Sequence, residues 1–155
     1  MPAPEIIAAL TARFSATPAA LGVEIPAASL MTALRALRDA HGYRYYVLGT
    51  ATERETTYEV IHAVRNLETG DTLFVRVAVP KDAAALDSIA FVYAGAEWQE
   101  REIYDLFGVH FAAHPDLRRL LMPDEYPGHP LRKNFAMDTP WGYRPATNPA
   151  AEVKP

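Results

Sequence analysis

The chain has 155 residues, 50% of them hydrophobic, and a formal net charge of −4 at pH 7. This length suits one domain, and a slightly acidic chain without a basic stripe argues against nucleic acid as a main partner. Because there is no cysteine, the chain cannot supply thiolate ligands to an iron–sulfur cluster, form a disulfide or use a cysteine nucleophile.

The sequence also carries no membrane or secretion signal that we can identify. No run approaches the roughly 18 apolar residues of a membrane-spanning helix. The N-terminal stretch, from Met1 to Phe14, lacks the basic and long apolar regions of a signal peptide. We therefore expect a soluble, cytoplasmic chain that reaches a membrane only through partners.

The first two thirds of the chain alternate between helix and strand patterns. Residues 56–65 show the period of a half-buried strand, residues 68–71 form a turn signal, and residues 73–79 are almost continuously apolar, as in a central strand. In chain order we predict a helix over 4–14, a strand over 20–25, a helix that Ser29 caps and Gly42 ends, strands over 43–48, 56–65 and 73–79, and a short helix over 88–93.

Together these elements predict an α+β fold: a small mixed or antiparallel sheet of about four strands, with helices packed on one face and an irregular C-terminal strap after them. We assign residues 1–135 to a single α+β domain and 136–155 to a Pro-rich extended tail. The tail is either disordered or an extended arm on a neighbour, with Trp141 and Tyr143 as anchors.

Residues 97–135 contain the most informative pattern. A helix over 98–107 would place Ile103, Leu106 and Phe107 on a core-facing stripe, and Gly108 would end it. Its other face carries Trp98, which we expect to be partly buried because a large indole is rarely left in water.

A second short helix over 115–122 and an irregular strap over 129–133 are expected to follow. Three charged residues on the first helix, Arg101, Glu102 and Asp105, face a region with three arginines. We hypothesise that one of them pairs with Arg118, Arg119 or Arg132 and so pins the strap.

No self-contained active site is visible. His110 and His114 have the spacing of a helical metal pair, but Gly108 and Pro115 interrupt a helix there. Glu100 and Glu102 cannot act together, because residues two apart on a helix point away from each other. Gly-x-Ser-x-Gly and Gly-x-Gly-x-x-Gly motifs are absent. We expect His62 to be a hydrogen-bonded strand residue and His129 to anchor the strap.

Three motifs carry a family resemblance: EREIYDLFG at residues 100–108, HPDLRR at 114–119 and GHPLRK at 128–133. Together they resemble the signature of the thirty-kilodalton subunit family of respiratory complex I, whose members are the C-type subunits, or J-type in the plastid form. The stretch that contains these motifs, residues 97–135, is about a quarter of the chain.

The resemblance implies a non-catalytic scaffold subunit in the peripheral arm of a proton-translocating NADH:quinone oxidoreductase. Such a subunit packs against the forty-nine-kilodalton-type subunit on the cytoplasmic side of the membrane, and FMN and the iron–sulfur clusters reside in partner subunits. We expect no cofactor, metal or catalytic residue in this chain. The expected structural or interface residues are Trp98, Arg101, Glu102, Tyr104, Asp105, His114, Asp116, Arg118, Arg119, His129, Arg132 and Lys133.

Two alternatives stay open. Relatives of this subunit also serve membrane-bound nickel–iron hydrogenases and coenzyme F420H2 dehydrogenases, so the electron donor is not determined by the sequence. From a different class, a free-standing small enzyme would use Glu102 with His114 or His129.

Overall fold

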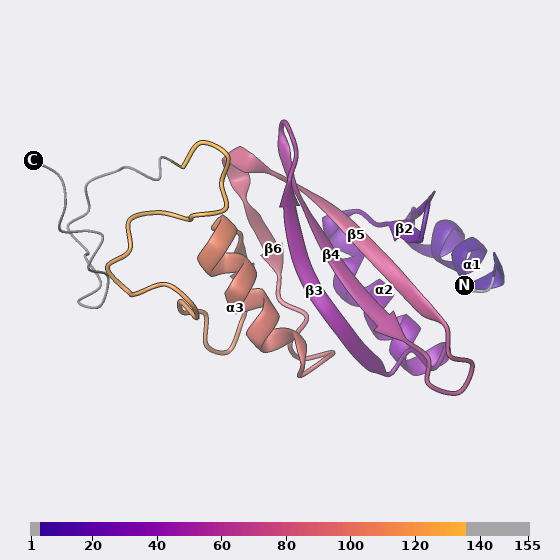
Figure 1. Ribbon diagram of the computed structural model, residues 1–155. Helices are drawn as coiled ribbons and strands as arrows, with labels where there is room; N and C mark the ends of the chain where they lie inside the picture. Colours follow the sequence, from indigo (N-terminus) through magenta and orange to yellow (C-terminus); the bar gives the residue numbers. More distant parts are fainter. Residues whose placement is uncertain (1–3, 136–155) are drawn as a thin grey trace, which may run out of the picture.

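The computed structural model describes residues 4–135 of the chain. A five-stranded mixed sheet lies at its centre, with the strand order β1-β2-β5-β4-β3 (Figure 1). The strands are β1 (Thr17–Ala19), β2 (Gly22–Glu24), β3 (Tyr45–Glu53), β4 (Thr57–Arg65) and β5 (Thr72–Pro80), and the helices are α1 (Pro4–Phe14), α2 (Leu30–Ala40) and α3 (Ala96–Phe107). Two 3-10 turns, η1 (Ala27–Ser29) and η2 (Lys81–Ala83), and a two-stranded parallel sheet of β6 (Ala85–Asp87) and β7 (His110–Ala112) complete the fold.

The alternation in residues 57–65 sets which face of the sheet is covered. Tyr58, Val60, His62 and Val64 are all buried, whereas the residues between them are mostly half-buried. Strand β4 pairs antiparallel with both β3 and β5, and β2 joins β5 in parallel. The predicted central strand is therefore confirmed as β5, and Gly70, at φ 77°, lies in the expected turn between β4 and β5.

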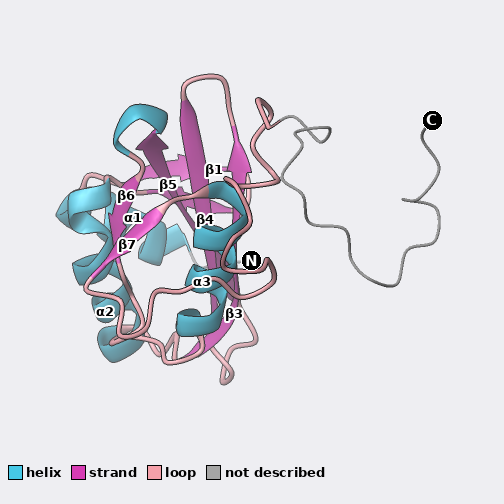
Figure 2. Cartoon of the chain, turned by 90° about the vertical axis from the view of Figure 1, so that its left-hand side faces the viewer, coloured by secondary structure: helices cyan, strands magenta, loops and turns pink. Residues whose placement is uncertain are grey.

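All three helices contribute to the core on the buried face of the sheet. Leu34 and Leu37 of α2 belong to the same hydrophobic cluster as Val60 and Val75. Helix α2 lies behind the sheet in Figure 1, and α1 lies at the right, next to β2. Helix α3 lies along the β3 edge, which faces the viewer in Figure 2. The expected α+β fold with helices on one face is confirmed.

The strand count is larger than expected. The region predicted as one strand over 20–25 is a small hairpin of β1 and β2, with Thr17 opposite Glu24. The strand expected over 43–48 extends to Glu53, and β6 and β7 were too short to be recognised as a pair. Such short strands form because they pair with a neighbouring strand and not because of a local sequence pattern. Predictions from sequence patterns therefore give too few strands.

One local prediction is wrong and another holds only in part. Residues 88–93 form a single turn, closed by hydrogen bonds from Val92 and Tyr93 to the carbonyl of Ile89, and not a helix. Ser29 lies at the N-cap position of α2, as predicted, but its side chain makes no capping hydrogen bond, and the residue also ends the 3-10 turn η1. The helix ending at Gly42 does form, and this glycine has φ 74°.

Candidate interface at helix α3 and segment 113–135

Segment 113–135 follows β7 and packs against α3 without forming a helix, so the helix expected over 115–122 is wrong. The reason is that side chains of α3 bind its backbone. The Arg101 guanidinium donates to the carbonyls of Arg118 and Arg119 at 3.2 and 3.1 Å. One carboxylate oxygen of Asp105 accepts the amides of residues 120, 121 and 122 at 3.0, 2.7 and 2.8 Å. Backbone groups that a helix would pair internally are thus satisfied by tertiary contacts.

The predicted ion pair between helix and segment is present between Asp105 and Arg119. Their side chains meet at 2.8 Å, and the Asp105 side chain is fully buried. Arg119 also donates to the carbonyls of Tyr126 and Gly128 at 2.9 and 3.0 Å. Burial alone would raise the pKa of Asp105, but the amides of Met122 and Leu121, Arg119 and the amide of Leu120 outweigh it and hold that pKa below its ordinary value.

The C-terminal end of α3 is covered by two further side chains of the segment. His129 donates its Nδ1–H to the Asp105 carbonyl at 2.9 Å, and its ring packs edge-on against Tyr104. Arg132 donates to the Phe107 carbonyl at 2.6 Å. A cation at the helix C-terminus satisfies carbonyls that lack helical partners and opposes the negative end of the helix dipole.

Gly108 makes this cover possible. It has φ 74°, the left-handed stop expected just after the helix. A Cβ at this position would lie 2.2 Å from Arg132 Nη2 and 2.5 Å from the His129 ring. Only glycine therefore allows both side chains to approach the helix end this closely.

A buried polar cluster on the opposite side of α3 was missed. The Glu100 carboxylate is fully buried, accepts the Ser88 hydroxyl at 2.6 Å and the Ile89 amide at 2.7 Å, and lies 3.8 Å from His114 Nε2. Burial raises the pKa of Glu100, against the opposing effects of Ser88, Ile89 and His114. Because Glu100 lies one turn before Ile103 on the core-facing side, the helical period contained the signal that would have found it.

His114 fastens the start of the segment to α3. Its Nδ1 accepts the Asp116 amide at 3.0 Å, so Nε2 carries the proton and donates to the Glu97 carbonyl at 2.9 Å. Asp116 pairs with Arg118 at 2.8 Å and lies 4.0 Å from Arg101. These contacts stay within the segment or reach α3.

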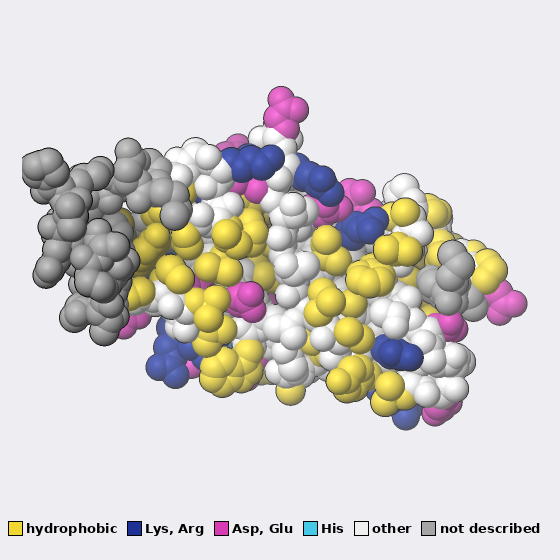
Figure 3. Space-filling view, in the orientation of Figure 1, with side chains coloured by type: hydrophobic (Ala, Val, Ile, Leu, Met, Phe, Trp, Pro, Cys, Tyr) yellow, Lys and Arg dark blue, Asp and Glu magenta, His cyan; other side chains and the backbone are white. Residues whose placement is uncertain are grey.

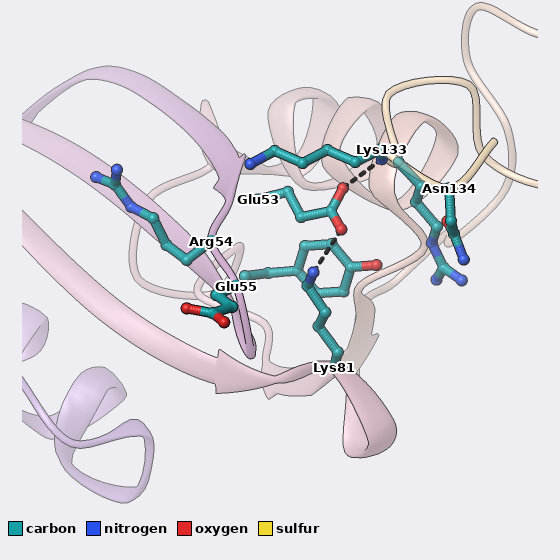
Figure 4. Close-up of a pocket in the computed structure, with 8 residues that line it drawn as sticks. Glu53, Arg54, Glu55, Lys81, Lys133 and Asn134 are labelled. Carbon is teal, nitrogen blue, oxygen red and sulfur yellow. Dashed lines mark hydrogen bonds and ion pairs between the residues drawn. The ribbon is translucent and has the colours of Figure 1, made fainter.

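A charged cleft of about 600 Å³ lies where the segment meets the β3–β4 hairpin (Figure 4). Glu53 accepts Lys81 Nζ and the Lys133 amide, both at 2.5 Å. The hydrogen bond from Lys81 and then that from the Lys133 amide hold the pKa of Glu53 below its ordinary value. Lys81 and Arg132 both lie over the Tyr58 ring, at 5.9 and 5.6 Å from its centroid. These interactions join the segment to the sheet edge.

Two expectations about α3 are corrected. Trp98 is 58% exposed rather than partly buried, although Arg101 lies 4.8 Å from its ring centroid. Glu102 is exposed and has no hydrogen bond or ion pair to any residue in 4–135, so it does not pin the segment. The hydrogen bond expected at His62 is present, to Tyr46 at 2.9 Å.

The described residues contain neither a cluster of three or more potential metal ligands nor a helix long and apolar enough to cross a membrane. His110 is exposed in β7, whereas the His114 side chain is buried, so the two do not form a pair. Trp141 and Tyr143 lie outside the described residues. The arrangement in residues 4–135 fastens a segment to a helix.

Comparison with solved structures shows the class of fold. The chain is similar to the trypsin-resistant fragment (1-134) of Nqo5, with 26% sequence identity and a TM-score of 0.62 over 73% of this chain and 97% of that one. It shares its fold with a chain of the membrane-bound sulfane sulfur reductase (MBS), an archaeal respiratory membrane complex. That match has 23% identity and a TM-score of 0.72 over 86% of this chain and 85% of that one.

The family model of the respiratory-chain NADH dehydrogenase 30 Kd subunit matches residues 23–140, and the chain belongs to this family. It is 41% identical over 88 residues to the NADH-quinone oxidoreductase C subunit of Geobacter metallireducens, covering 57% of this chain and 54% of that one. It is 43% identical over 79 residues to the NADH-quinone oxidoreductase C/D subunit of Methylococcus capsulatus, covering 51% of this chain and 14% of that one. The chain spans about half the length of the C-subunit relatives it matches first.

Proposed function

We propose that this chain is a non-catalytic scaffold subunit of the peripheral arm of a proton-translocating NADH:quinone oxidoreductase. The observation that carries the proposal is the family match over residues 23–140, which includes α3 and all of segment 113–135. The side chains that the resemblance singled out are, for the most part, used to fix that segment in place. A charged and aromatic edge that is held by hydrogen bonds and a buried ion pair suits a subunit that positions its neighbours.

The proposed partner is the forty-nine-kilodalton-type subunit, which is the D-type subunit in bacterial nomenclature. Support comes from the Methylococcus relative, whose C/D name indicates that the two are joined in one chain. FMN and the iron–sulfur clusters would be held by other subunits, as the family resemblance implies. For the clusters this agrees with the absence of cysteine, since the chain cannot ligate a cluster through thiolates. The chain would act on the cytoplasmic side of the membrane, attached through its partners.

Purification of the tagged full chain from its own cells tests this proposal. We expect the D-type subunit and further peripheral-arm subunits to co-purify, together with NADH:quinone oxidoreductase activity. A chain that elutes alone, or that turns over a substrate by itself, would contradict the scaffold role and favour the small-enzyme reading.

The same experiment separates the second candidate. The chain shares its fold with a chain of an archaeal respiratory membrane complex. The second candidate is therefore that it is the equivalent subunit of a different complex, such as a membrane-bound nickel–iron hydrogenase or an F420H2 dehydrogenase. Recovery of the large subunit of one of those enzymes in place of the D-type subunit would establish that alternative.

A further inference from the structure

One exposed face of α3 combines apolar side chains with a lone carboxylate. Trp98, Glu102 and Leu106 follow one another at intervals of four residues and so share this side of the helix, beside Leu131 of the segment. Trp98 is 58% and Leu131 51% exposed, and Leu106 is half-buried. Hydrophobic side chains gather over α3 in Figure 3, with an acidic group among them. We call these four residues the Glu102 face.

A small hollow opens within this face. It has a volume of about 80 Å³, lies between α3 and β3, and is lined by Glu102, Ile103, Leu106, Phe107 and Leu131 together with residues 49–51. A water molecule occupies about 30 Å³ in the liquid. The hollow therefore has room for the end of one apolar side chain from outside, next to the carboxylate.

The charge of Glu102 is uncompensated within residues 4–135. The helix positions three and four residues away hold Trp98, Gln99, Asp105 and Leu106, none of them a cation, and Asp105 is already paired with Arg119. Covering the apolar part of the face would remove water from this carboxylate. A carboxylate buried without a partner is strongly destabilising, so whatever covers the face has to bring hydrogen-bond donors to Glu102. A basic side chain is the donor that also compensates the charge.

We propose that the Glu102 face docks a partner polypeptide that presents one basic side chain to Glu102, with apolar side chains on either side and one of them in the hollow. The inference rests on the proposed function, and the partner is accordingly the D-type subunit. A second copy of this chain fits poorly, because a twofold contact through this face would bring two Glu102 carboxylates together.

The proposal is tested by substituting charged residues in the full chain and measuring the affinity of each variant for the D-type subunit from the same organism. We expect Glu102→Gln to weaken binding about tenfold, since it removes one partner of a charge pair, and Glu102→Lys about a hundredfold, since it places two like charges together. Glu68→Lys is the matched control. Glu68 is also exposed but lies in the turn between β4 and β5, and we expect this variant to bind like the wild type.

Two failures are distinguishable. If the wild-type chain does not bind the D-type subunit, the proposed function is wrong. If the wild-type chain binds and Glu102→Lys binds equally well, the proposed function survives and the Glu102 face is not the docking surface. Because Glu102 is exposed in the middle of a helix, neither substitution should alter the fold, and the thermal unfolding of each variant checks this.

A photo-crosslinking amino acid at position 98 identifies the occupant in the assembled complex. The proposal is supported by an adduct on the D-type subunit close to an arginine or lysine. Substituting that residue by glutamate should then restore the binding of Glu102→Lys. An adduct on residues 136–155 of this chain or on a second copy would overturn it.

Discussion

The two sides of helix α3 are held to the rest of the molecule by different forces. Its core side packs Ile103 and Phe107 into the hydrophobic cluster and also holds the buried carboxylate of Glu100. Its other side holds segment 113–135 through hydrogen bonds from Arg101 and to Asp105. Apolar packing tolerates exchange of similar side chains, whereas a polar junction depends on particular donors and acceptors. Substitutions on the two sides should therefore differ in size and in pH dependence.

The largest expected effect is that of Asp105→Asn. Asparagine has the same shape, but one of its terminal groups becomes an N–H donor that faces either Arg119 or the amides of residues 120–122. We expect a loss of about 3–5 kcal/mol in the free energy of unfolding, because a buried charge loses its partner. Urea denaturation measures the loss, and amide hydrogen exchange should become faster at residues 120–122.

The matched control is Asp116→Asn. Asp116 also pairs with an arginine, Arg118 at 2.8 Å, but its side chain is 46% exposed. Exposed pairs contribute about 0–1 kcal/mol, so this variant should unfold close to the wild type. Equal losses in the two variants would refute the idea that Asp105 is the main fastening point of segment 113–135.

An intermediate effect is expected from Gly108→Ala. Alanine is strained at φ 74°, and its Cβ would collide with Arg132 and His129. We expect a loss of about 1–3 kcal/mol. Gly70→Ala separates the two causes, since Gly70 has φ 77° but its nearest neighbour would lie 4.0 Å from the added Cβ. If the two variants lose the same stability in thermal unfolding, the contact with Arg132 and His129 contributes nothing.

The same contrast explains what the sequence could predict. Alternation in residues 57–65 and the apolar run before Pro80 are local patterns, and the sheet face and central strand follow from them. The irregular course of residues 115–122 could not be predicted. Pro115 and the leucines after it favour a helix locally, whereas the hydrogen bonds that hold the backbone in another course come from Arg101 and Asp105, which are distant in sequence. The sequence could predict that an ion pair joins the helix and the segment, because opposite charges recur at close spacing. It could not predict that the pair is Asp105–Arg119, because the charges allowed several pairings.

Glu100 and Glu102 show where the helical pattern was read incompletely. Two residues apart, they point away from each other as expected, one fully buried and one exposed. The stripe that was assigned to the core contained Leu106, which is only half-buried, and omitted Glu100. A carboxylate on a core-facing stripe is usually discounted, since burying it costs free energy unless donors surround it. Here Ser88 and Ile89, from the turn between β6 and α3, supply those donors.

The smallest expected effect is a difference in pH dependence between the two sides of α3. Burial raises the folded-state pKa of Glu100 above its ordinary value of 4.5. The native state then binds a proton more tightly than the unfolded state, so stability falls as the pH rises from that value through the raised pKa. Asp105 has a lowered pKa, and its contribution is present above its ordinary pKa and lost as the pH falls.

Glu100→Gln isolates the first effect, because glutamine imitates the protonated carboxyl. We expect the free energy of unfolding of the wild type, minus that of Glu100→Gln, to decrease as the pH is raised above 4.5. Urea denaturation at a series of pH values measures this difference. Glu102→Gln, on the exposed side of the same helix, is the control for replacing a glutamate of α3 by glutamine. If the difference in the free energy of unfolding for Glu100→Gln instead rises with pH, Ser88, Ile89 and His114 stabilise the charged carboxylate by more than burial destabilises it. Glu100 and Asp105 would then depend on pH in the same direction, and the two sides of α3 would not differ in this respect.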